Sequence, residues 1–324
     1  MKQFIVKCCK VGFLFYLLLW LIQIVIDTGL RQSEDDTYYN WNKLYNGGIN
    51  ADILFLGSSR TLKHYDPQIF DEKLNVYSYN LGSNGSAYDI QKIKRNAYLR
   101  NNSKPELIVL NVDIGSLSKS SEIYNKKQFL PYYSLKNYKD MSNIDASVFY
   151  EYLFPMSKYR ENFDLISLSV KSLIGIEEKN LNTIKGFSGS NQKWNNSFEN
   201  RLKELNGKKF DYSKFNYKER LSFFETEVLD INQSKIPLLL VWAPEYVGRQ
   251  YLESDILDKT IRDVKNVANK YDGVEFIDFT KDSICYDTYY FYNSYHLNKI
   301  GATKFSNMVS DSINKYFKKV KKSD

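Results

Sequence analysis

Two short segments of the chain hold the residue types that a serine nucleophile and its base require. The first covers residues 53–60 (ILFLGSSR), an apolar run that ends in small residues, and the second covers residues 293–298 (NSYHLN). His296 is one of only two histidines in 324 residues. A serine hydroxyl is a weak nucleophile near neutral pH and needs a neighbouring base to take its proton. The two segments therefore predict a Ser-His site at the carboxyl edge of a sheet, where open α/β folds bind ligands.

The segments resemble the SGNH, or GDSL-like, hydrolase superfamily, and most closely its membrane-anchored branch, whose first block reads Gly-Ser-Ser-Arg. The resemblance implies that Ser59 is the nucleophile. It also implies that residues 80–85 (NLGSNG) are the second block, so that the backbone N–H groups of Ser59 and Gly85 form the oxyanion hole. The last block assigns the base to His296. The order and spacing agree over roughly residues 50–317 and leave the middle third unexplained.

Two positions depart from the family pattern. Residues 113–116 (DIGS) stand where the family often has Gly-x-Asn-Asp, so the side-chain amide that completes the oxyanion hole is missing there. Asn293 stands where the family has the Asp that orients the histidine. An Asn can hold one imidazole tautomer but cannot stabilise the imidazolium with a full charge, and in a serine protease this Asp to Asn change lowers kcat by about 10⁴.

Three further residues are candidates for substrate contact: Arg60, Asn84 and Asp113. Arg60 could attract an anionic group or pair with a local carboxylate, and Asp113 could orient a ligand or cap the next segment. His64 could face the site, or it could be a solvated or capping histidine. The sequence has no Cys/His metal spacing and no nucleotide-binding glycine fingerprint, so we expect neither a metal nor another cofactor.

An apolar segment near the N-terminus predicts a membrane anchor. Residues 11–26 are apolar except for Gln23, and with their flanking turns they approach the ~20 residues that a spanning helix needs. Lys2, Lys7 and Lys10 precede the segment and acidic residues follow it, so the positive-inside rule places the N-terminus in the cytoplasm and the rest of the chain outside. No small-x-small cleavage site follows, which favours an uncleaved anchor over a signal peptide. A buried core helix is the remaining alternative.

Behind the anchor, apolar strands alternate with helices. We expect strands at residues 51–56, 76–79, 107–112, 237–242 and 274–277, and helices around 90–99, 217–233, 257–271 and 299–317. This pattern predicts an α/β fold with a mainly parallel sheet between two layers of helices, as in the SGNH three-layer sandwich, plus one N-terminal transmembrane helix. We divide the chain into a stub and anchor (1–30), a linker (31–48) and one domain (49–324). Residues 116–211 would be an insertion, either a lid over the site or a packing element.

Composition narrows the choice of partners. The formal net charge is +7, and no basic stripe with interleaved aromatic residues occurs, so nucleic acid is not an expected partner. Aromatic residues make up 16% of the chain, which reflects either the composition of the source genome or a carbohydrate-contacting surface. The family resemblance implies O-acyl transfer or ester hydrolysis on an envelope or secreted polysaccharide, beside a membrane-bound O-acyltransferase. The alternative is a noncatalytic SGNH-like protein that binds a polysaccharide or such an acyltransferase.

Overall fold

The computed structural model describes residues 1–118, 120, 122–134, 141–177 and 181–320. The predicted insertion and the predicted domain each include positions outside these ranges. The chain forms two compact units: unit 1 comprises Met1–Asn46 with Ser121–Asn182, and unit 2 comprises Gly47–Ser120 with Thr183–Asp324. Each unit is therefore assembled from segments that are distant in sequence.

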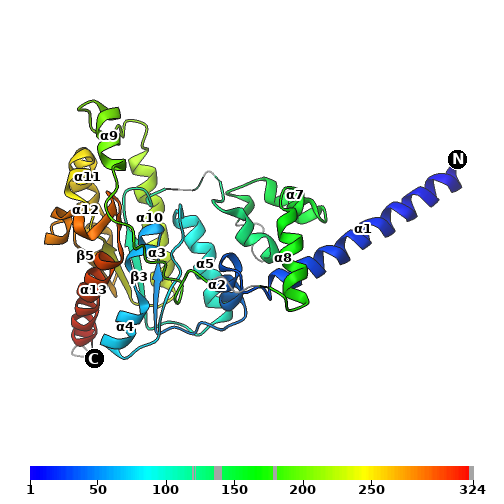
Figure 1. Cartoon of the computed structure of the whole chain (residues 1–324), viewed down its shortest axis with the longest axis horizontal. Coiled ribbons are helices and arrows are strands. Elements are labelled where there is room, and N and C mark those ends of the chain that lie inside the picture. Colours follow the sequence, from blue (N-terminus) through cyan, green and yellow to red (C-terminus); the bar gives the residue numbers. More distant parts are fainter. Residues whose placement is uncertain (119, 121, 135–140, 178–180, 321–324) are drawn as a thin grey trace. The chain divides into compact units, whose positions relative to one another are not determined.

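Unit 2 is built on a five-stranded parallel sheet, which confirms the α/β class (Figure 1). The strand order is β2-β1-β3-β4-β5, a doubly wound order in which the chain reverses direction across the sheet between β1 and β3. Ligands bind beyond the carboxyl ends of the strands at such a switch point. The strands are β1 (Ile53–Leu56), β2 (Ser78–Asn80), β3 (Leu107–Val112), β4 (Leu238–Trp242) and β5 (Val274–Asp278).

Helices cover both faces of this sheet. On one face, Ile53 and Phe55 of β1 pack with Phe70 of α4 and Phe305 of α13 in a fully buried cluster. On the other face, Tyr88 of α5 contacts Phe224 of α10 with ring centroids 5.4 Å apart. In Figure 1 the red α13 and the cyan α5 lie on opposite sides of the strands. The helices of unit 2 are α3 (Ser59–His64), α4 (Pro67–Leu74), α5 (Tyr88–Asn101), α9 (Ser197–Leu205), α10 (Tyr217–Gln233), α11 (Val247–Leu252), α12 (Ser254–Ala268) and α13 (Lys299–Val320).

A short antiparallel pair, β6 (Phe291–Asn293) and β7 (His296–Leu297), precedes α13. Between β5 and this pair lie two single turns of 3₁₀ helix, η3 (Ser283–Tyr286) and η4 (Thr288–Tyr290). The tight turn from β6 to β7 brings the last sequence block into one compact corner of unit 2.

Unit 1 is helical. It contains α1 (Lys2–Leu30), α2 (Asp36–Tyr45), η1 (Lys126–Tyr132), α7 (Ser147–Leu153), η2 (Ser157–Tyr159) and α8 (Phe163–Leu173). Residues 31–48, expected to be a linker, instead include α2, whose Tyr38 and Trp41 are buried. Trp41 packs edge-on against Phe129 of η1. The described residues between 122 and 182 of the expected insertion thus pack with the N-terminal segment as a unit of their own, because both segments bury aromatic side chains against each other.

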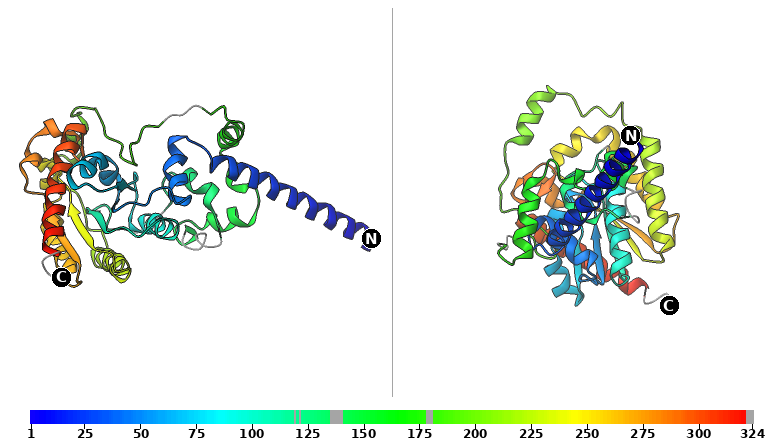
Figure 2. Two further views of the ribbon diagram at one scale, coloured as in Figure 1. Left: turned by 90° about the horizontal axis from the view of Figure 1, so that it is seen from below. Right: turned by 90° about the vertical axis from the view of Figure 1, so that its right-hand side faces the viewer.

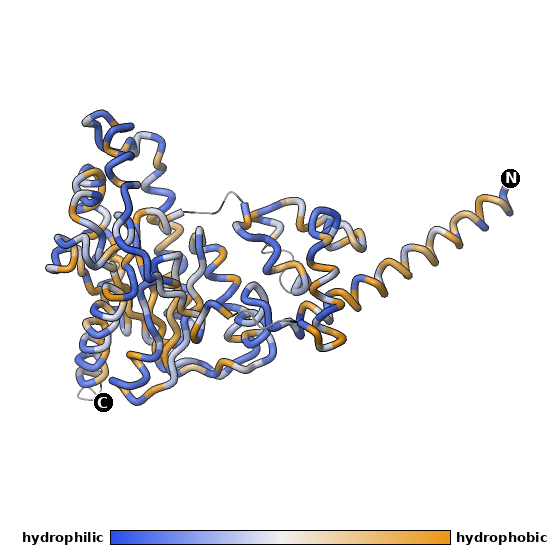
Figure 3. The backbone as a smooth tube through the Cα atoms, viewed as in Figure 1, coloured by the Kyte–Doolittle hydropathy of each residue, from blue (hydrophilic) through white to orange (hydrophobic). Residues whose placement is uncertain are grey.

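The 29-residue helix α1 is long and apolar enough to cross a membrane. Its N-terminal part extends beyond the other helices of unit 1 (Figures 1 and 2), and most of its residues are hydrophobic (Figure 3). The structure thus agrees with a single membrane-anchoring helix at the N-terminus.

Candidate active site

Ser59 is the first residue of α3 and lies directly beyond the carboxyl end of β1. The turn that places it there depends on Gly57, whose φ of 148° is unfavourable for residues with a side chain. A Cβ at Gly57 would lie 2.0 Å from Oγ1 of Thr61, and that hydroxyl already donates to the Leu56 carbonyl at 3.0 Å. The strand, the glycine turn and the first turn of α3 therefore fix the serine together.

Ser59, His296 and Asn293 form a hydrogen-bonded relay. The Ser59 Oγ and the His296 Nε2 are 2.8 Å apart, and the His296 Nδ1 is 3.1 Å from Asn293 Oδ1. Asn293 Oδ1 also accepts the backbone N–H groups of Tyr295 and His296, each at 2.9 Å. Because this oxygen can only accept, Nδ1 carries the ring proton and Nε2 has a free lone pair for the serine hydroxyl.

His296 is held in a neutral state. Burial, followed by the positive charges of Arg60, Lys63 and Arg249, lowers the pKa of His296 to about 3. Tyr292 stacks on the imidazole with ring centroids 5.4 Å apart and planes 7° apart. The imidazole is thus ready to accept a proton at neutral pH, but its protonated form is strongly disfavoured.

His64 has a different role from any that we expected. Its side chain is fully buried, so it is not a solvated histidine, and its Nε2 accepts the backbone N–H of Leu297 at 3.0 Å. Burial, followed by the charges of His296 and Arg60, lowers the pKa of His64 well below its ordinary value. His64 therefore joins α3 to β7 as a neutral acceptor and supports the position of the neighbouring His296.

A buried chain of alternating charges lies beside the relay. Arg60 is ion-paired with Glu245, and Arg249 contacts Glu245 at 3.7 Å and is ion-paired with Glu253. All four side chains are at most 8% exposed. Burial raises the pKa of Glu253, and the Glu245 carboxylate raises it further. Arg60 thus has the structural carboxylate partner that was one of our two interpretations.

Sequence reasoning missed Glu245, Arg249 and Glu253. Arg249 lies in α11, and Glu245 and Glu253 lie just outside this helix, four residues before and four residues after Arg249. This spacing is also typical of solvated helices, so it could not show by itself that the three side chains are buried at the site.

A pocket of about 490 Å³ opens over Ser59 at the switch point between β1 and β3. The structure places Ser59, Arg60, Gly85, Asp113 and His296 in its wall. Further lining residues include Tyr212, Phe215, Arg249, Glu253 and Tyr295. Gly85 has a φ of 62°. Thus the residues after β1, the loop after β2 and the residues after β3 meet at one edge, as the topology requires.

Of the two remaining residues predicted to contact substrate, Asp113 lines the pocket and Asn84 does not. Asp113 accepts the Ser58 hydroxyl at 3.2 Å and the Ser116 backbone N–H at 2.7 Å, so it caps the turn after β3 while also lining the pocket. Asn84 is exposed and is not among the residues that line this pocket. Among the residues that the structure describes, no group of three or more His, Cys, Asp or Glu side chains could hold a metal ion.

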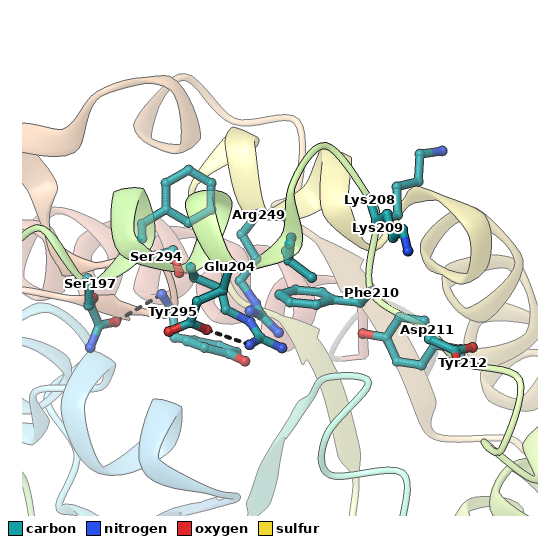
Figure 4. A pocket seen from close by; sticks show the side chains of 14 residues that line it. Ser197, Glu204, Lys208, Lys209, Phe210, Asp211, Tyr212, Arg249, Ser294 and Tyr295 are labelled. Carbon is teal, nitrogen blue, oxygen red and sulfur yellow. Dashed lines mark hydrogen bonds and ion pairs between the residues drawn. The ribbon is translucent and has the colours of Figure 1, made fainter.

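A second pocket, of about 810 Å³, shares part of its wall with the first. Figure 4 shows the side chains that line this second pocket. Tyr212, Arg249 and Tyr295 line both pockets, and Asn293 lines the second. The Arg249 guanidinium lies 3.2 Å from the centroid of the Tyr295 ring. The outer wall carries Phe198, Arg201, Glu204, Lys208, Lys209, Phe210 and Asp211. The relay is therefore bordered on two sides by hollows that share an aromatic and cationic wall.

Comparison with known proteins gives one family. The sequence profile of DUF1574, described as a protein of unknown function, matches residues 49–301. No curated protein matches the chain. The matched segment includes the whole relay, from Ser59 to His296. Since the profile covers most of the chain, the protein belongs to the DUF1574 family.

Proposed function

We propose that this protein is a membrane-anchored, SGNH-like serine enzyme that transfers or hydrolyses O-acyl groups on a polysaccharide of the cell envelope or a secreted polysaccharide. The observation that carries the proposal is the relay of Ser59, His296 and Asn293 beneath a pocket at the carboxyl edge of a parallel sheet. A serine, a base and an orienting group in this order can perform nucleophilic acyl transfer.

In this mechanism His296 Nε2 takes the Ser59 proton while Oγ forms a bond to the acyl carbonyl carbon. The negative charge on the carbonyl oxygen is stabilised by the backbone N–H groups of Ser59 and Gly85, and each such donor contributes about 3 kcal/mol in comparable sites. The tetrahedral species collapses when the C–O bond to the donor alcohol breaks, and His296 returns its proton to that leaving oxygen. A sugar hydroxyl or water, deprotonated by His296, then attacks the acyl-serine ester. The bond between the acyl carbon and Ser59 Oγ breaks, and His296 returns its proton to Oγ.

The second pocket supports a glycan as substrate. Phe210, Tyr212 and Tyr295 contribute rings to its wall, and rings with a polar edge suit contact with sugars at a partly wet surface. The shared wall would let the acyl group occupy the pocket over Ser59 while neighbouring sugar units occupy the second pocket. A membrane-bound O-acyltransferase is the partner that this arrangement would use as its source of acyl groups.

Lysines at the N-terminal end of α1, before its apolar run, and acidic residues after this run support an extracytoplasmic position for the residues after Asp27. Protease added to intact spheroplasts should then digest these residues while the short N-terminus stays protected. Complete protection of the chain until the membrane is dissolved would contradict this orientation.

A noncatalytic binding protein is the second candidate. It is favoured by the uncharged Asn293 and by the burial and cationic surroundings that lower the pKa of His296, because all of these disfavour the imidazolium that catalysis needs. In that case the same pockets would bind a polysaccharide or an acyltransferase without covalent chemistry.

Labelling by a fluorophosphonate distinguishes the two candidates, since the reagent reacts with an activated serine. The full-length protein in membranes should be labelled at Ser59, as located by peptide mass. Ser59→Ala should abolish the label, and Ser58→Ala should retain it because the Ser58 hydroxyl bonds to Asp113 and not to His296. A native protein that stays unlabelled while folded would refute the catalytic proposal and favour the binding protein.

A further inference from the structure

Unit 1 exposes a concentration of large apolar side chains near α1. Phe163 is 71% exposed, Tyr150 and Ile174 are each 62% exposed, and Phe154 is 56% exposed. Exposed apolar groups in this number mark an interaction surface. We call this surface the collar, and define it as Phe149, Tyr150, Leu153, Phe154, Phe163, Val170, Leu173, Ile174 and Ile176, which lie on α7, α8 and their C-terminal ends.

Unit 2 shows no comparable cluster among its described residues. Its exposed large apolar side chains number seven among the residues described, and four of them are tyrosines, whose hydroxyls are compatible with water. They are Ile184, Leu202, Tyr251, Tyr286, Tyr289, Tyr295 and Ile300. The collar is therefore a local property of the helices beside α1 and does not follow from the aromatic composition of the whole chain.

The helices of the collar are bonded along α1. The Tyr16 hydroxyl donates to the Leu153 carbonyl at 2.8 Å, and the Met156 backbone N–H donates to Gln23 Oε1 at 2.7 Å. Further along α1, the Lys158 ammonium pairs with the Asp27 carboxylate at 2.8 Å. The polar groups that α1 brings into this contact are thus paired inside unit 1, as a low-dielectric environment requires.

The bond to Tyr16 fixes the depth of the collar. A hydrocarbon core of about 30 Å is spanned by about 20 helical residues. A span that begins at Val11, just after the last lysine, ends at Leu30, and a span that begins at Phe4 ends at Gln23. Tyr16 lies inside the hydrocarbon in both placements. Of the two, the span that ends at Gln23 leaves Asp27 outside the hydrocarbon, and it places Tyr16 about 10 Å from the unit 1 end, so Leu153 at the end of α7 lies in the leaflet next to unit 1.

The exposed charged residues beside α1 lie near its C-terminal end, away from Tyr16. The exposed pair Arg160 and Glu161 directly follows Tyr159, whose hydroxyl bonds to Asp27. Asp27 is 11 residues beyond Tyr16, which corresponds to about 16 Å along the helix axis. The apolar end of α7 thus meets the deep part of the span, and the charged turn before α8 meets its polar end.

We propose that the collar is embedded in the lipid leaflet that surrounds the unit 1 end of α1, where the acyl chains of the bilayer cover its apolar side chains. Helices α7 and α8 then act as an interfacial membrane-binding element beside a spanning helix. Continuity with the exposed apolar surface of α1, which includes Phe13, Leu17 and Leu21, favours lipid over a protein partner. The proposal requires α1 to span the membrane and is independent of the chemistry at Ser59.

Site-specific fluorescence quenching tests the proposal in the full-length protein. The background carries Cys8→Ser, Cys9→Ser and Cys285→Ala, and an environment-sensitive fluorophore is attached after Phe154→Cys. Ile174→Cys repeats the test on α8, and Glu161→Cys is the matched control in the charged turn. The protein is reconstituted into vesicles of phosphatidylethanolamine and phosphatidylglycerol.

Lipids with a nitroxide on the acyl chain should quench the label at position 154 several-fold more strongly than aqueous iodide does. The label at position 161 should show the reverse order. Strong iodide quenching at positions 154 and 174 would show that the collar lies in water and would overturn the proposal. Protection of these labels from both quenchers would also overturn the proposal, because a protein would then cover the collar. If this protection disappeared when each vesicle held a single protein copy, the covering protein would be a second copy of this chain.

Discussion

Replacing Asn293 by Asp should increase the reactivity of Ser59 and change its dependence on pH. Asn293 Oδ1 lies 3.1 Å from His296 Nδ1, so a carboxylate there would attract the imidazolium by about 5 kcal/mol at an effective dielectric constant of 20. At 1.36 kcal/mol per pH unit this corresponds to a pKa rise of about 4. The cost of burying the new carboxylate reduces the gain, and we expect the pKa of His296 to rise from about 3 to between about 5 and 7.

The sign of the pH effect follows from the role of the base. His296 accepts a proton only when it is neutral, and the native pKa of about 3 keeps it neutral throughout pH 5–8. The rate of fluorophosphonate labelling of the native protein should therefore show no change due to protonation of His296 between pH 5 and pH 8. Asn293→Asp should be labelled between about 10-fold and 10⁴-fold faster at pH 8. Its rate should fall about tenfold per pH unit below the new pKa.

The measurement is the initial rate of adduct formation at Ser59 against pH, with the fold checked by thermal unfolding. Asn269→Asp, at the exposed C-cap of α12, adds the same charge on unit 2 and should leave the rate unchanged. A folded Asn293→Asp protein that labels no faster at pH 8, or a native profile with an acid limb near pH 6.5, would refute this account of the relay.

Three substitutions test the scaffold of the site through stability and labelling. Arg60→Met should destabilise unit 2 by about 3–5 kcal/mol in denaturant unfolding because it leaves Glu245 without this ion pair, and a loss below 1 kcal/mol would contradict a buried pair. Gly57→Ala should lower the free energy of unfolding by about 2–6 kcal/mol and reduce labelling of Ser59 in the remaining folded protein, because the new Cβ would collide with Thr61. Normal stability and normal labelling would show that the turn does not require glycine. His64→Leu should lower the free energy of unfolding by about 1–3 kcal/mol, because it removes the acceptor for the Leu297 backbone N–H in β7. His64→Gln should lose less stability in the same assay, and equal losses in the two variants would argue against the hydrogen bond.

Local sequence patterns predicted the elements of unit 2 well. The third strand and the helix from Tyr217 to Gln233 have the expected bounds, because continuous apolar runs and helical periodicity report burial within one element. Helix α12 ends at Ala268, three residues earlier than expected. Helix ends depend on capping and on the contacts of the last turn, which periodicity does not describe.

The relay and its surroundings differ in how far they could be predicted. Ser59, Asn293 and His296 stand in motifs whose resemblance to a known family implies that they meet, and the structure joins their side chains by hydrogen bonds. The division of the chain into two units was not predictable in this way. It depends on pairings such as that of Asp27 with Lys158, which no local pattern encodes because either residue alone is typical of a polar surface.

The pairing of Asp27 with Lys158 also has a consequence for the order of events during synthesis. The two residues are 131 positions apart, so at 5–20 residues per second Asp27 precedes its partner by roughly 7 to 26 s. During that interval the anchor helix can enter the membrane while its carboxylate has no Lys158 to bind, and the first three strands of unit 2 are made before unit 1 can close. A nascent chain halted before Lys158 should therefore hold its anchor less firmly in the bilayer than the finished protein does.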